Sequence, residues 1–568
     1  MTMERPQNRH SPGEKHLSGR KIGLRLGILG VVAALAVGTG VGLWQYEHNK
    51  VDKSYDVLVV GSGPGGIAAA IQAARMGEHV AVLEETDWVG GQMTAADVGT
   101  MDEGNPAVRK SGIYGEFVQR ATDYYRSRGK SMGTCYFATN TLCVDPHDGQ
   151  VILRQMLGQE GNNLTLYTGT HVSDVIKQNN TVVGVRANGK RFDSKVLIDS
   201  EQYGDVLAQA SARYRVGNTL SDAPNASPNA CVQDITYSPV MKYYPNGVPT
   251  SLVIKTPPPG YDPEVLKRFA KVLTKDGHGL VVEAGKLKLQ GDPLAFPAYA
   301  SYRGLPDLSN PADADALQQD GHFITRTALN LGNDYPLNGR LSTKYLTDLS
   351  FRAHSNAQAE LLSLQLIYYI QHDLGFTNWS IANDEGYDQN YNKTHHYPEL
   401  KGYEAFEDLM PQLPYVREGR RAVGEYTLSG KDLYSSQTDP KHIVPRADSV
   451  AVGYYAMDLH DCRFPASLEG GLDDTSYIRE YKGGPYEVPI GTLIPQGMNG
   501  LLVTDNNISV SREANGATRV QPTAMAIGQA AGALAALSIH NHEQPHSVNV
   551  SEVRTALLNA HAVVGVHS

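Results

Sequence analysis

The sequence predicts an α/β fold built around a parallel sheet, and three observations near residue 60 support this fold class. An apolar run from Val57 to Val60 lies between a charge and a glycine, which is typical of a buried parallel strand. A second apolar run, Val80 to Leu83, follows an Ala-rich stretch of helical period from Ile67 to Met76. Between the first strand and this helix, three glycines have G-x-G-x-x-G spacing: Gly61, Gly63 and Gly66. Strand, glycine turn, helix and strand together predict a Rossmann-like dinucleotide-binding unit.

Each residue type in this unit suits a nucleotide diphosphate or its ribose. Gly61 permits the tight turn, Gly63 lets the backbone approach the pyrophosphate, and Gly66 lets the helix pack on the strand. The helix N-terminus, which includes Gly65, presents unpaired N–H groups and a positive dipole to the diphosphate. Glu84, about 20 residues after the turn, is placed to accept hydrogen bonds from the adenosine ribose. An isolated glycine turn would be a weak signal, but here the whole unit is present and in order.

Two further stretches indicate which dinucleotide is bound. Paired glycines after the second strand are a feature of flavoproteins, and they occur in Trp88-Val89-Gly90-Gly91-Gln92-Met93. With its C-terminal motifs, the chain resembles the FAD-dependent oxidoreductases of the glutathione-reductase-like flavoprotein superfamily, in a broad and mostly uncharacterised branch. The C-terminal match consists of Leu501-Leu502-Val503, Asp505-Asn506, Ile508-Ser509, Gly516-Ala517-Thr518-Arg519-Val520 and Gly528 to Gly532.

The resemblance implies that the chain binds FAD through residues near both ends of the sequence. It implies cofactor contacts at Gly91, Gln92 and Gln529, and a ribityl or pyrophosphate contact at Asp505. Arg519 would approach the flavin or pair with a nearby carboxylate. The helix that follows Arg519 would direct its N-terminal N–H groups at the flavin and stabilise the reduced anion.

The chain departs from this family after the strand that returns to the nucleotide sheet. Relatives continue with Ala-Thr-Gly-Asp-Gly-Asp, whereas this chain continues with Ser200-Glu201-Gln202-Tyr203-Gly204-Asp205. Gly204 and Asp205 match, but flavin contacts at Ser200 and Glu201 do not follow from the resemblance. The sequence contains no second G-x-G-x-x-G unit for NAD(P)H. We therefore expect the substrate itself, or an external partner, to reduce the flavin.

The first 50 residues predict a membrane anchor. Residues 1–25 form a basic tail, and residues 26–46 contain an uncharged apolar run of about 19 residues, long enough to span a bilayer as a single transmembrane helix. Because the basic side comes first, the positive-inside rule places the N-terminus in the cytoplasm and the catalytic body on the other side. The main alternative is a cleaved export signal, which would leave a secreted or periplasmic protein.

The rest of the chain is expected to form an FAD-binding domain in two parts, separated by a substrate domain. A length of 568 residues with 41% hydrophobic residues allows two or more domains, and the net charge of −10 carries no nucleic-acid footprint. The first part covers residues 55–205, and residues 490–540 complete the domain before a C-terminal tail or helix at 541–568. Residues 206–489 are predicted to form a mixed α+β substrate or cap domain, with a long helix within 347–374.

Several short apolar segments in the first part are predicted strands. Four of them would form a three-stranded β insertion with its connections: Leu164 to Tyr167, Val172 to Lys177, Thr181 to Ala187 and Lys190 to Asp193. A separate strand, Lys195 to Asp199, would return to the parallel sheet.

The four cysteines leave their pairing open. Cys135 and Cys143 are close enough in sequence to form a disulfide outside the cytoplasm, or to remain two unpaired small residues. Cys231 and Cys462 cannot be paired from the sequence. No C-x-x-C is present, which disfavours a dithiol-reductase mechanism, and no metal-ligand spacing predicts a metal site.

Three groups of charged residues are candidates for the chemistry at the flavin. Oxidation of a C–H bond by a flavin needs a base for the accompanying proton and positive charge for the anion that forms. His460, in an Asp-x-His similar to that of the family, is the first acid–base candidate, and a structural core histidine is the alternative. Arg417 and Arg420 concentrate positive charge in an Arg-Glu-x-Arg-Arg stretch, whose alternative is a salt-bridged surface turn. Arg512 stands where relatives often carry His, which would change the substrate charge or the base.

We therefore expect an FAD-dependent oxidoreductase that oxidises a small polar organic substrate by hydride transfer to flavin N5, with a possible external electron acceptor. The first alternative is a flavin monooxygenase or halogenase. The second is a flavin-bearing electron-relay subunit of a membrane complex, without a substrate pocket. A substrate-sized cavity at the flavin N5, lined by His460 or Arg420, would favour the first expectation, and an open flavin edge on a large apolar patch would favour the relay.

Overall fold

A computed structural model of the chain describes residues 50–134, 142–223, 225–262, 264–265, 267, 269, 275–283, 286–291, 303–309, 325–337, 339–438, 445–475 and 484–566. Lys53–Ser568 forms one compact unit. The predicted basic tail, the predicted transmembrane segment at 26–46 and Cys135 lie outside the described residues, so the predictions for them remain untested.

The centre of this unit is the predicted Rossmann-like sheet. Among the described strands, seven join in one sheet, with the order β5-β2-β1-β8-β7-β6 and β23 paired to β8. The parallel strands are β5 (Leu164–Tyr167), β2 (Val80–Leu83), β1 (Lys53–Val60), β8 (Lys190–Asp199) and β23 (Leu501–Val503). Val57 to Val60 are buried because the sheet is covered on both faces, which explains their uninterrupted apolar run.

The β insertion differs in detail from the prediction. β6 (Val172–Gln178) pairs antiparallel with β7 (Thr181–Ala187), and β7 pairs antiparallel with the first residues of β8. β8 pairs in parallel with β1 from Phe192 to Asp199 and with β23 from Leu197 to Asp199. The two strands expected at 190–193 and 195–199 are therefore one strand, because its pairing with β1 runs from Lys53 to Val60. Leu164–Tyr167 is not part of the insertion, since it pairs in parallel with β2 at the edge of the main sheet.

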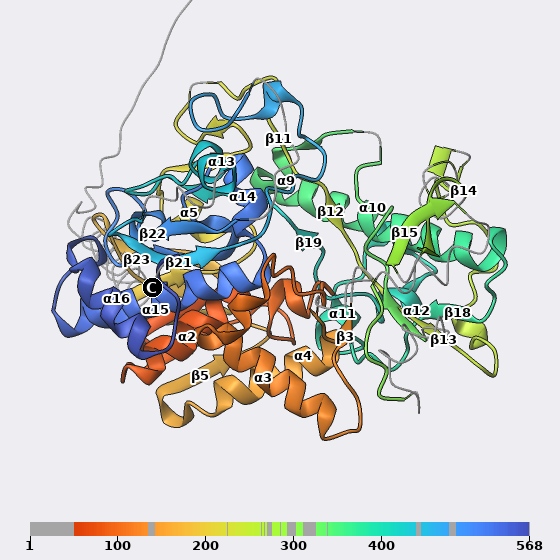
Figure 1. Ribbon diagram of the computed structural model, residues 1–568, viewed down its shortest axis with the longest axis horizontal. Helices are drawn as coiled ribbons and strands as arrows, with labels where there is room; N and C mark the ends of the chain where they lie inside the picture. Colours follow the sequence, from red (N-terminus) through yellow and green to blue (C-terminus); the bar gives the residue numbers. More distant parts are fainter. Residues whose placement is uncertain are drawn as a thin grey trace, which may run out of the picture. The chain divides into compact units, whose positions relative to one another are not determined.

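Two helices from opposite ends of the chain pack closely together. α2 (Pro64–Arg75) and α15 (Gln521–His540) lie side by side, drawn in orange-red and blue in Figure 1. A Cβ on Gly528 would lie 2.0 Å from the Gly65 carbonyl oxygen, and one on Gly532 would lie 2.3 Å from that of Ala69. These glycines therefore let the two helix backbones touch. In the described part of the chain, α15 is the one helix long and apolar enough to cross a membrane, but 83% of its apolar window is buried.

The predicted middle region contains a second hydrophobic core around the predicted long helix. α10 (Leu349–Tyr368) begins at Asp348, whose carboxylate accepts hydrogen bonds from the Ser350 and Phe351 N–H groups, and continues as a π-helix to Asp373. Small antiparallel sheets make up the rest of this region, and those near α10 are drawn mostly in green in Figure 1. The sheet of Ser449–Gly453 and Tyr486–Pro489 instead packs beside α15. The strands of these small sheets are β9 (Tyr214–Val216), β10 (Thr219–Leu220), β11 (Cys231–Val232), β12 (Ile235–Thr236), β13 (Val240–Tyr243), β14 (Lys275–Glu283), β15 (Lys286–Gly291), β16 (Arg326–Ala328), β17 (Leu341–Ser342), β18 (Trp379–Ile381), β19 (Tyr415–Val416), β20 (Arg421–Ala422), β21 (Ser449–Gly453) and β22 (Tyr486–Pro489).

The remaining elements cover the sheets or connect them. The strand pair β3 (Gly133–Thr134) and β4 (Leu142–Cys143) lies in the sequence between the helices Gly112–Arg126 and Pro146–Gly158. The other described helices are α3 (Gly112–Arg126), α4 (Pro146–Gly158), α5 (Asp205–Gln209), α9 (Lys344–Thr347), α11 (Asn390–Thr394), α12 (Glu404–Glu407), α13 (Gly430–Thr438), α14 (Arg512–Thr518) and α16 (Val550–Asn559). The last helix matches the expectation for 541–568.

A disulfide connects two segments that are distant in sequence. Cys231 and Cys462 are bonded, although nothing in the sequence paired them. Cys143 is also disulfide-bonded, and no described cysteine is free. The predicted partner of Cys143, Cys135, lies outside the described residues.

Candidate functional site

A cavity of about 890 Å³ lies at the carboxyl ends of the parallel strands, where α/β sheets bind their ligands. Its size is in the range of small-molecule and cofactor pockets. One side is the nucleotide-binding part: residues 60–64, 83–85, 91–92, 170–173, 200–209 and 505–506. The other side is the middle region: Tyr237, residues 346–356 in part, residues 391–398 in part, residues 412–416 in part, and Arg420. The cavity therefore joins the two predicted domains.

The glycine turn forms one wall of the cavity. A Cβ on Gly61, whose φ is +87°, would lie 2.6 Å from the Ser200 carbonyl oxygen, and one on Gly66 would lie 2.4 Å from that of Gly61. These two positions need glycine for backbone packing. At Gly63 the nearest atoms to an added Cβ are those of the Asp505 carboxylate, 3.3 Å away. Gly63 therefore keeps the helix N-terminus open to a ligand, as FAD binding requires.

Glu84 lies at the end of β2 and lines the cavity. Its carboxylate accepts four hydrogen bonds, from the N–H and hydroxyl groups of Ser62 (2.9 and 2.6 Å) and of Thr86 (2.8 and 2.7 Å). Burial raises the pKa of Glu84, and these donors oppose that shift. A carboxylate has about four lone-pair sites, so a ribose hydroxyl can bind only when a Ser62 or Thr86 hydroxyl turns away.

Asp505 closes the cavity opposite the glycine turn. Its carboxylate accepts hydrogen bonds from the Gly65 N–H (3.1 Å) and from the hydroxyls of Thr504 (3.0 Å) and Ser200. Burial raises the pKa of Asp505, and these donors lower it again. The Gly66 N–H also donates to this carboxylate, so a ribityl hydroxyl can bind only when the Ser200 or Thr504 hydroxyl turns away. Ser200, for which the family motif gave no expectation, supports this carboxylate.

Glu201 also lines the cavity, in the stretch where the chain departs from its relatives. Its carboxylate accepts hydrogen bonds from the backbone N–H groups of Tyr203 (2.8 Å) and Asp205. Burial and the neighbouring Asp205 raise the pKa of Glu201 to about 7. A Cβ added at Gly61 would lie 2.7 Å from the backbone nitrogen of Glu201, so Glu201 packs directly on the glycine turn.

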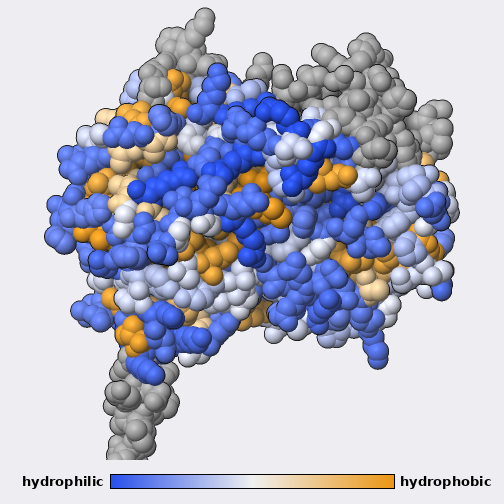
Figure 2. Space-filling view, turned by 90° about the horizontal axis from the view of Figure 1, so that it is seen from below, coloured by the Kyte–Doolittle hydropathy of each residue, from blue (hydrophilic) through white to orange (hydrophobic). Residues whose placement is uncertain are grey.

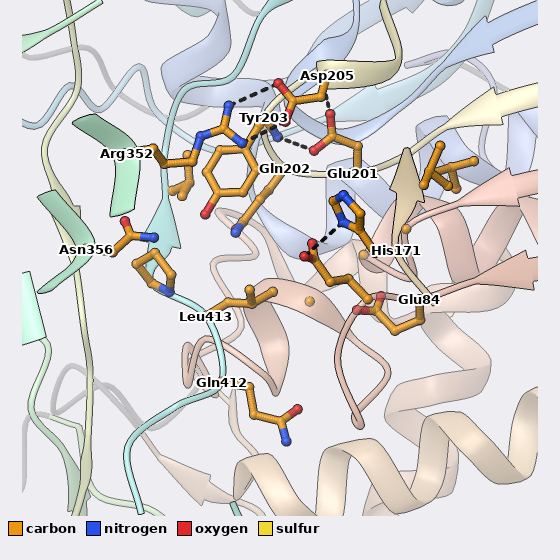
Figure 3. A pocket seen from close by; sticks show the side chains of 18 of the residues that line it. Glu84, His171, Glu201, Gln202, Tyr203, Asp205, Arg352, Asn356, Gln412 and Leu413 are labelled. Atoms are coloured by element: carbon orange, nitrogen blue, oxygen red, sulfur yellow. Dashed lines mark hydrogen bonds and ion pairs between the residues drawn. The ribbon is translucent and has the colours of Figure 1, made fainter. Parts of the chain in front are cut away.

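Charged residues of the middle region close the cavity beside Glu201. Arg352 binds Asp205 through two hydrogen bonds (2.6 and 3.0 Å), and Arg420 pairs with the same carboxylate. Figure 3 shows Arg352, Asp205 and Tyr203 together on one side of the cavity, with Glu84 on the opposite side. Arg420 thus lies in the cavity wall, and its partner is the family-matching Asp205.

Gly91 and Gln92 extend the cavity away from the nucleotide end. A Cβ on Gly91, whose φ is +51°, would lie 2.9 Å from the Gly63 Cα, so the paired glycines pack against the diphosphate turn. The Gln92 side-chain amide donates a hydrogen bond to the Arg519 carbonyl (2.8 Å). Gln92 therefore connects the cavity to the N-terminus of α15, where the flavin was expected to lie.

A cluster of alternating charges continues from Arg519. The Arg519 guanidinium pairs with Asp458 (3.1 Å), and the other contacts of this carboxylate include His460 Nε2 (3.0 Å). His460 Nδ1 lies 3.2 Å from Asp334, which pairs with Arg417 (3.0 Å). We call these five residues the His460 cluster. A histidine ring can donate to carboxylates at both nitrogens only as the imidazolium.

The two carboxylates of the His460 cluster are held ionised. Burial pushes the pKa of Asp334 and of Asp458 up, but the neighbouring cations outweigh burial and lower both. About a third of the His460 side chain is exposed, as is 39% of Asp458. His460 is thus neither fully buried nor free of ion-pair partners, and both the acid–base role and the structural role remain predictions.

Other predicted residues have structural contacts. Arg417 and Arg420 are both buried, so the alternative of a surface turn is wrong. Arg512 is fully buried and pairs with Glu418 (2.8 Å), outside the described cavity wall. Gln529 also lies outside that wall, because its amide joins α15 to Gln72 (2.9 Å) and to the Ile113 N–H (3.1 Å). We assign the contacts of Arg512 and Gln529 to packing.

The sequence missed Asp334 and gave Asp458 no role. Asp334 lies 126 residues before His460 in an irregular stretch, so no local pattern signals the contact. Asp458 is the first residue of the Asp-x-His stretch, and its two-residue spacing from His460 was the available signal of their contact. Nearby Asp234 is also buried, and burial, Asp461 and Asp334 raise its pKa to about 9.

Comparisons with known proteins indicate the family of the chain. A family model described as FAD dependent oxidoreductase matches residues 56–557. The chain is 29% identical to sarcosine oxidase subunit alpha from Corynebacterium sp. (strain P-1) over 211 residues, covering 32% of this chain and 22% of that protein. It is 31% identical over 159 residues to the tRNA uridine 5-carboxymethylaminomethyl modification enzyme MnmG from Treponema pallidum (strain Nichols), covering 25% of each. The chain thus spans about a quarter of the length of these relatives.

A similar solved structure is L-proline dehydrogenase from P. horikoshii. It has 15% identity and a TM-score of 0.25, over 35% of this chain and 62% of that one.

Proposed function

Because the chain belongs to the FAD dependent oxidoreductase family, we propose that it oxidises a small polar organic substrate beside Gln92 and Arg519, with His460 in proton transfer. FAD is the cofactor of this family, and bound FAD supplies a two-electron acceptor for hydride. The observation that carries the proposal is the His460 cluster, which is joined to the cavity through the Gln92–Arg519 hydrogen bond and is partly exposed.

The residues present fit FAD. The open turn at Gly63 and the N-terminus of α2 would hold the diphosphate, and Glu84 would hold the adenosine ribose. The Asp505 carboxylate would accept a hydrogen bond from a ribityl hydroxyl when the Ser200 or Thr504 hydroxyl turns away. These residues come from both ends of the chain, as the resemblance implied.

The His460 cluster would handle the proton that leaves the substrate. Asp334 and Arg417 fix one side of the His460 ring, so its orientation does not depend on the substrate. Asp458, of which 39% of the side chain is exposed, contacts the other ring nitrogen, and there a substrate hydroxyl or amine could exchange a proton with the Asp458–His460 pair. Arg519, beside Asp458, would stabilise negative charge that develops nearby.

The relay alternative receives less support. Among the described residues, the large apolar side chains with high exposure are Val51, Leu308, Leu349 and Leu558. On the face shown in Figure 2, apolar residues form small groups among polar ones. A docking partner for electron transfer would favour a larger apolar patch.

We also propose that residues 26–46 hold this enzyme at a membrane, with Lys53–Ser568 on the non-cytoplasmic side. The Cys231–Cys462 disulfide supports this location, because stable disulfides are typical of oxidising compartments.

A His460→Gln variant tests the proposed function. The assay is anaerobic bleaching of the flavin by a panel of sugars, hydroxy acids, other alcohols and amines. We expect one class to bleach the wild-type flavin, and the variant to keep FAD but react roughly 10²–10⁴ times more slowly, the usual contribution of acid–base catalysis.

The matched control is His354→Gln. His354 lies on α10, is exposed and pairs with Glu399 (3.0 Å), so its replacement should leave the rate unchanged. An undiminished rate in His460→Gln would remove His460 from the chemistry.

A further inference from the structure

We infer that the Cys231–Cys462 disulfide positions His460, so that the enzyme works only while this bond is oxidised. The inference rests on the proposed function of His460. It assigns the two cysteines and the segment between Cys231 and Thr236 a positioning role in the reaction.

The disulfide attaches the His460 turn to a distant strand. Cys462 follows His460 by two residues, and its partner Cys231 begins β11, 231 residues earlier in the chain. Both cysteines are buried, with 1% and 4% of their surfaces exposed. The bond therefore ties a partly exposed catalytic turn to the interior.

The segment after Cys231 holds both the backbone of His460 and its ring. The Gln233 side chain accepts a hydrogen bond from the His460 N–H (3.0 Å), and the Asp234 N–H donates to the His460 carbonyl (3.2 Å). Two residues further on, Thr236 binds Asp334, the carboxylate that contacts His460 Nδ1. One short segment thus makes two hydrogen bonds with the backbone of His460 and contacts its ring through Asp334.

Gln233 is itself held in place. Its side-chain amide donates to Asn515 (3.1 Å) on α14, and its backbone N–H donates to Glu418 (3.2 Å). Because Glu418 also pairs with Arg512, the supporting segment is fixed to the interior by buried polar contacts. The disulfide attaches the turn that carries His460 to this fixed segment.

The turn has a backbone that needs such support. Asp461 and Cys462 both have left-handed φ angles, +47° and +43°, although neither is glycine. This conformation is unfavourable for L-residues and persists only where the surroundings impose it. Arg512 contributes by binding the Cys462 carbonyl (2.9 Å) and sulfur (3.1 Å). Without the covalent bond, we expect the turn to relax and His460 to leave its position between Asp334 and Asp458.

The same change should leave FAD bound. Neither cysteine is among the described residues that line the cavity, and the Gly63, Glu84 and Asp505 contacts come from other segments. Loss of the disulfide is therefore expected to separate cofactor binding from turnover.

The test compares the wild-type holoenzyme with the double variant Cys231→Ser, Cys462→Ser. We expect the double variant to keep its full FAD content and to show an altered pH profile of the rate. Flavin reduction should be slowed by at least about tenfold, because small misplacements of catalytic groups have such effects. Cys143→Ser is the matched control, since it removes the other disulfide of the described residues and leaves the His460 turn intact.

Hydrogen exchange measures the positioning without turnover. The amides of His460 and Asp234 should exchange faster in the double variant than in the wild type and in Cys143→Ser. Unchanged exchange and an unchanged rate would overturn the inference. If His460→Gln has no effect while exchange still increases, the proposed function fails and the positioning stands.

A second measurement applies if the double variant does not fold. The folded wild-type holoenzyme is treated with dithiothreitol until both thiols can be alkylated, and the reagent is then removed. Dithiothreitol forms a cyclic disulfide, and its two electrons and two protons convert the Cys231–Cys462 bond into two thiols. Activity should fall in proportion to the reduced fraction and return on reoxidation; full activity of the fully reduced protein would refute the positioning role.

Discussion

Two glycines of the same turn should respond in opposite ways to the same substitution. Gly63 has φ −58° and ψ 173°, a conformation open to alanine, and an added Cβ would approach only the Asp505 carboxylate, at 3.3 Å. At Gly66 an added Cβ would lie 2.4 Å from the Gly61 carbonyl oxygen and 2.6 Å from the Ser200 hydroxyl. Gly63→Ala should therefore spare the fold, whereas Gly66→Ala should disturb it.

The magnitudes follow from these contacts. The Gly63→Ala methyl group would narrow the opening of the turn that would hold the diphosphate, so we expect loss of about one charge-assisted hydrogen bond, roughly 1.5–3 kcal/mol. That loss weakens FAD binding by about ten- to a hundredfold. Gly66→Ala forces backbone atoms apart, and such overpacking costs about 1–3 kcal/mol in the free energy of unfolding.

The assay uses the two apoproteins side by side. Thermal unfolding of each apoprotein gives its stability, and an FAD titration followed by flavin fluorescence gives its affinity. We expect Gly63→Ala to unfold with the wild type and bind FAD weakly, and Gly66→Ala to unfold earlier. Wild-type FAD affinity in Gly63→Ala, or equal destabilisation by both substitutions, would refute the assignment of the diphosphate to this turn.

Two further predictions concern buried acids. FAD affinity should fall as the pH rises through about 7, because Glu201 then ionises and repels the diphosphate. The affinity should fall by about tenfold for each unit by which bound FAD raises the pKa of Glu201. Dissociation constants near pH 6 and pH 8 measure this, and an equally steep change in Glu201→Gln would contradict it. At a pH between the ordinary pKa of an aspartate and about 9, Asp234 is protonated in the folded protein and ionised in the unfolded chain. Over this range the free energy of unfolding therefore falls by about 1.4 kcal/mol for each pH unit. Asp234→Asn should therefore gain stability over the wild type as the pH rises from 5 to 8 in chemical denaturation, and a pH-independent difference would exclude this role.

The nucleotide-binding part could be predicted because its signals are local. The apolar run Val57–Val60, the glycine turn and Glu84 lie within one short stretch, and each has its own residue pattern. Even there, the start of α2 was placed too late, since Pro64 begins the helix. Proline is favoured at the first helical position, which the sequence could have indicated.

The middle region could not be predicted in the same way. β12 pairs with β19 across about 180 residues of sequence, in strands of two residues each, which are too short to show alternation. The pairing of Cys231 with Cys462 and of Asp334 with His460 likewise joins distant segments. These contacts depend on the folded arrangement.

The C-terminal motif shows how a family pattern can suggest the wrong physical role. Gln529 lies in Gly-Gln-Ala-Ala-Gly and was expected at the cofactor, but it ties α15 to α2 and α3. The small residues of the motif have the same purpose, because Gly528 and Gly532 let α15 contact α2. The motif is therefore part of the support beneath the glycine turn.

The contact between the Gly65 N–H and Asp505 spans 440 residues, and this separation sets an order for assembly. While the chain is being synthesised, the glycine turn emerges early, but the carboxylate opposite it, β23 and α15 emerge among the last residues. Until then the face of α2 that α15 covers has no partner from the C-terminal segment. A chain that crosses a membrane during its synthesis would therefore complete its cofactor cavity on the far side, and would have to acquire FAD there.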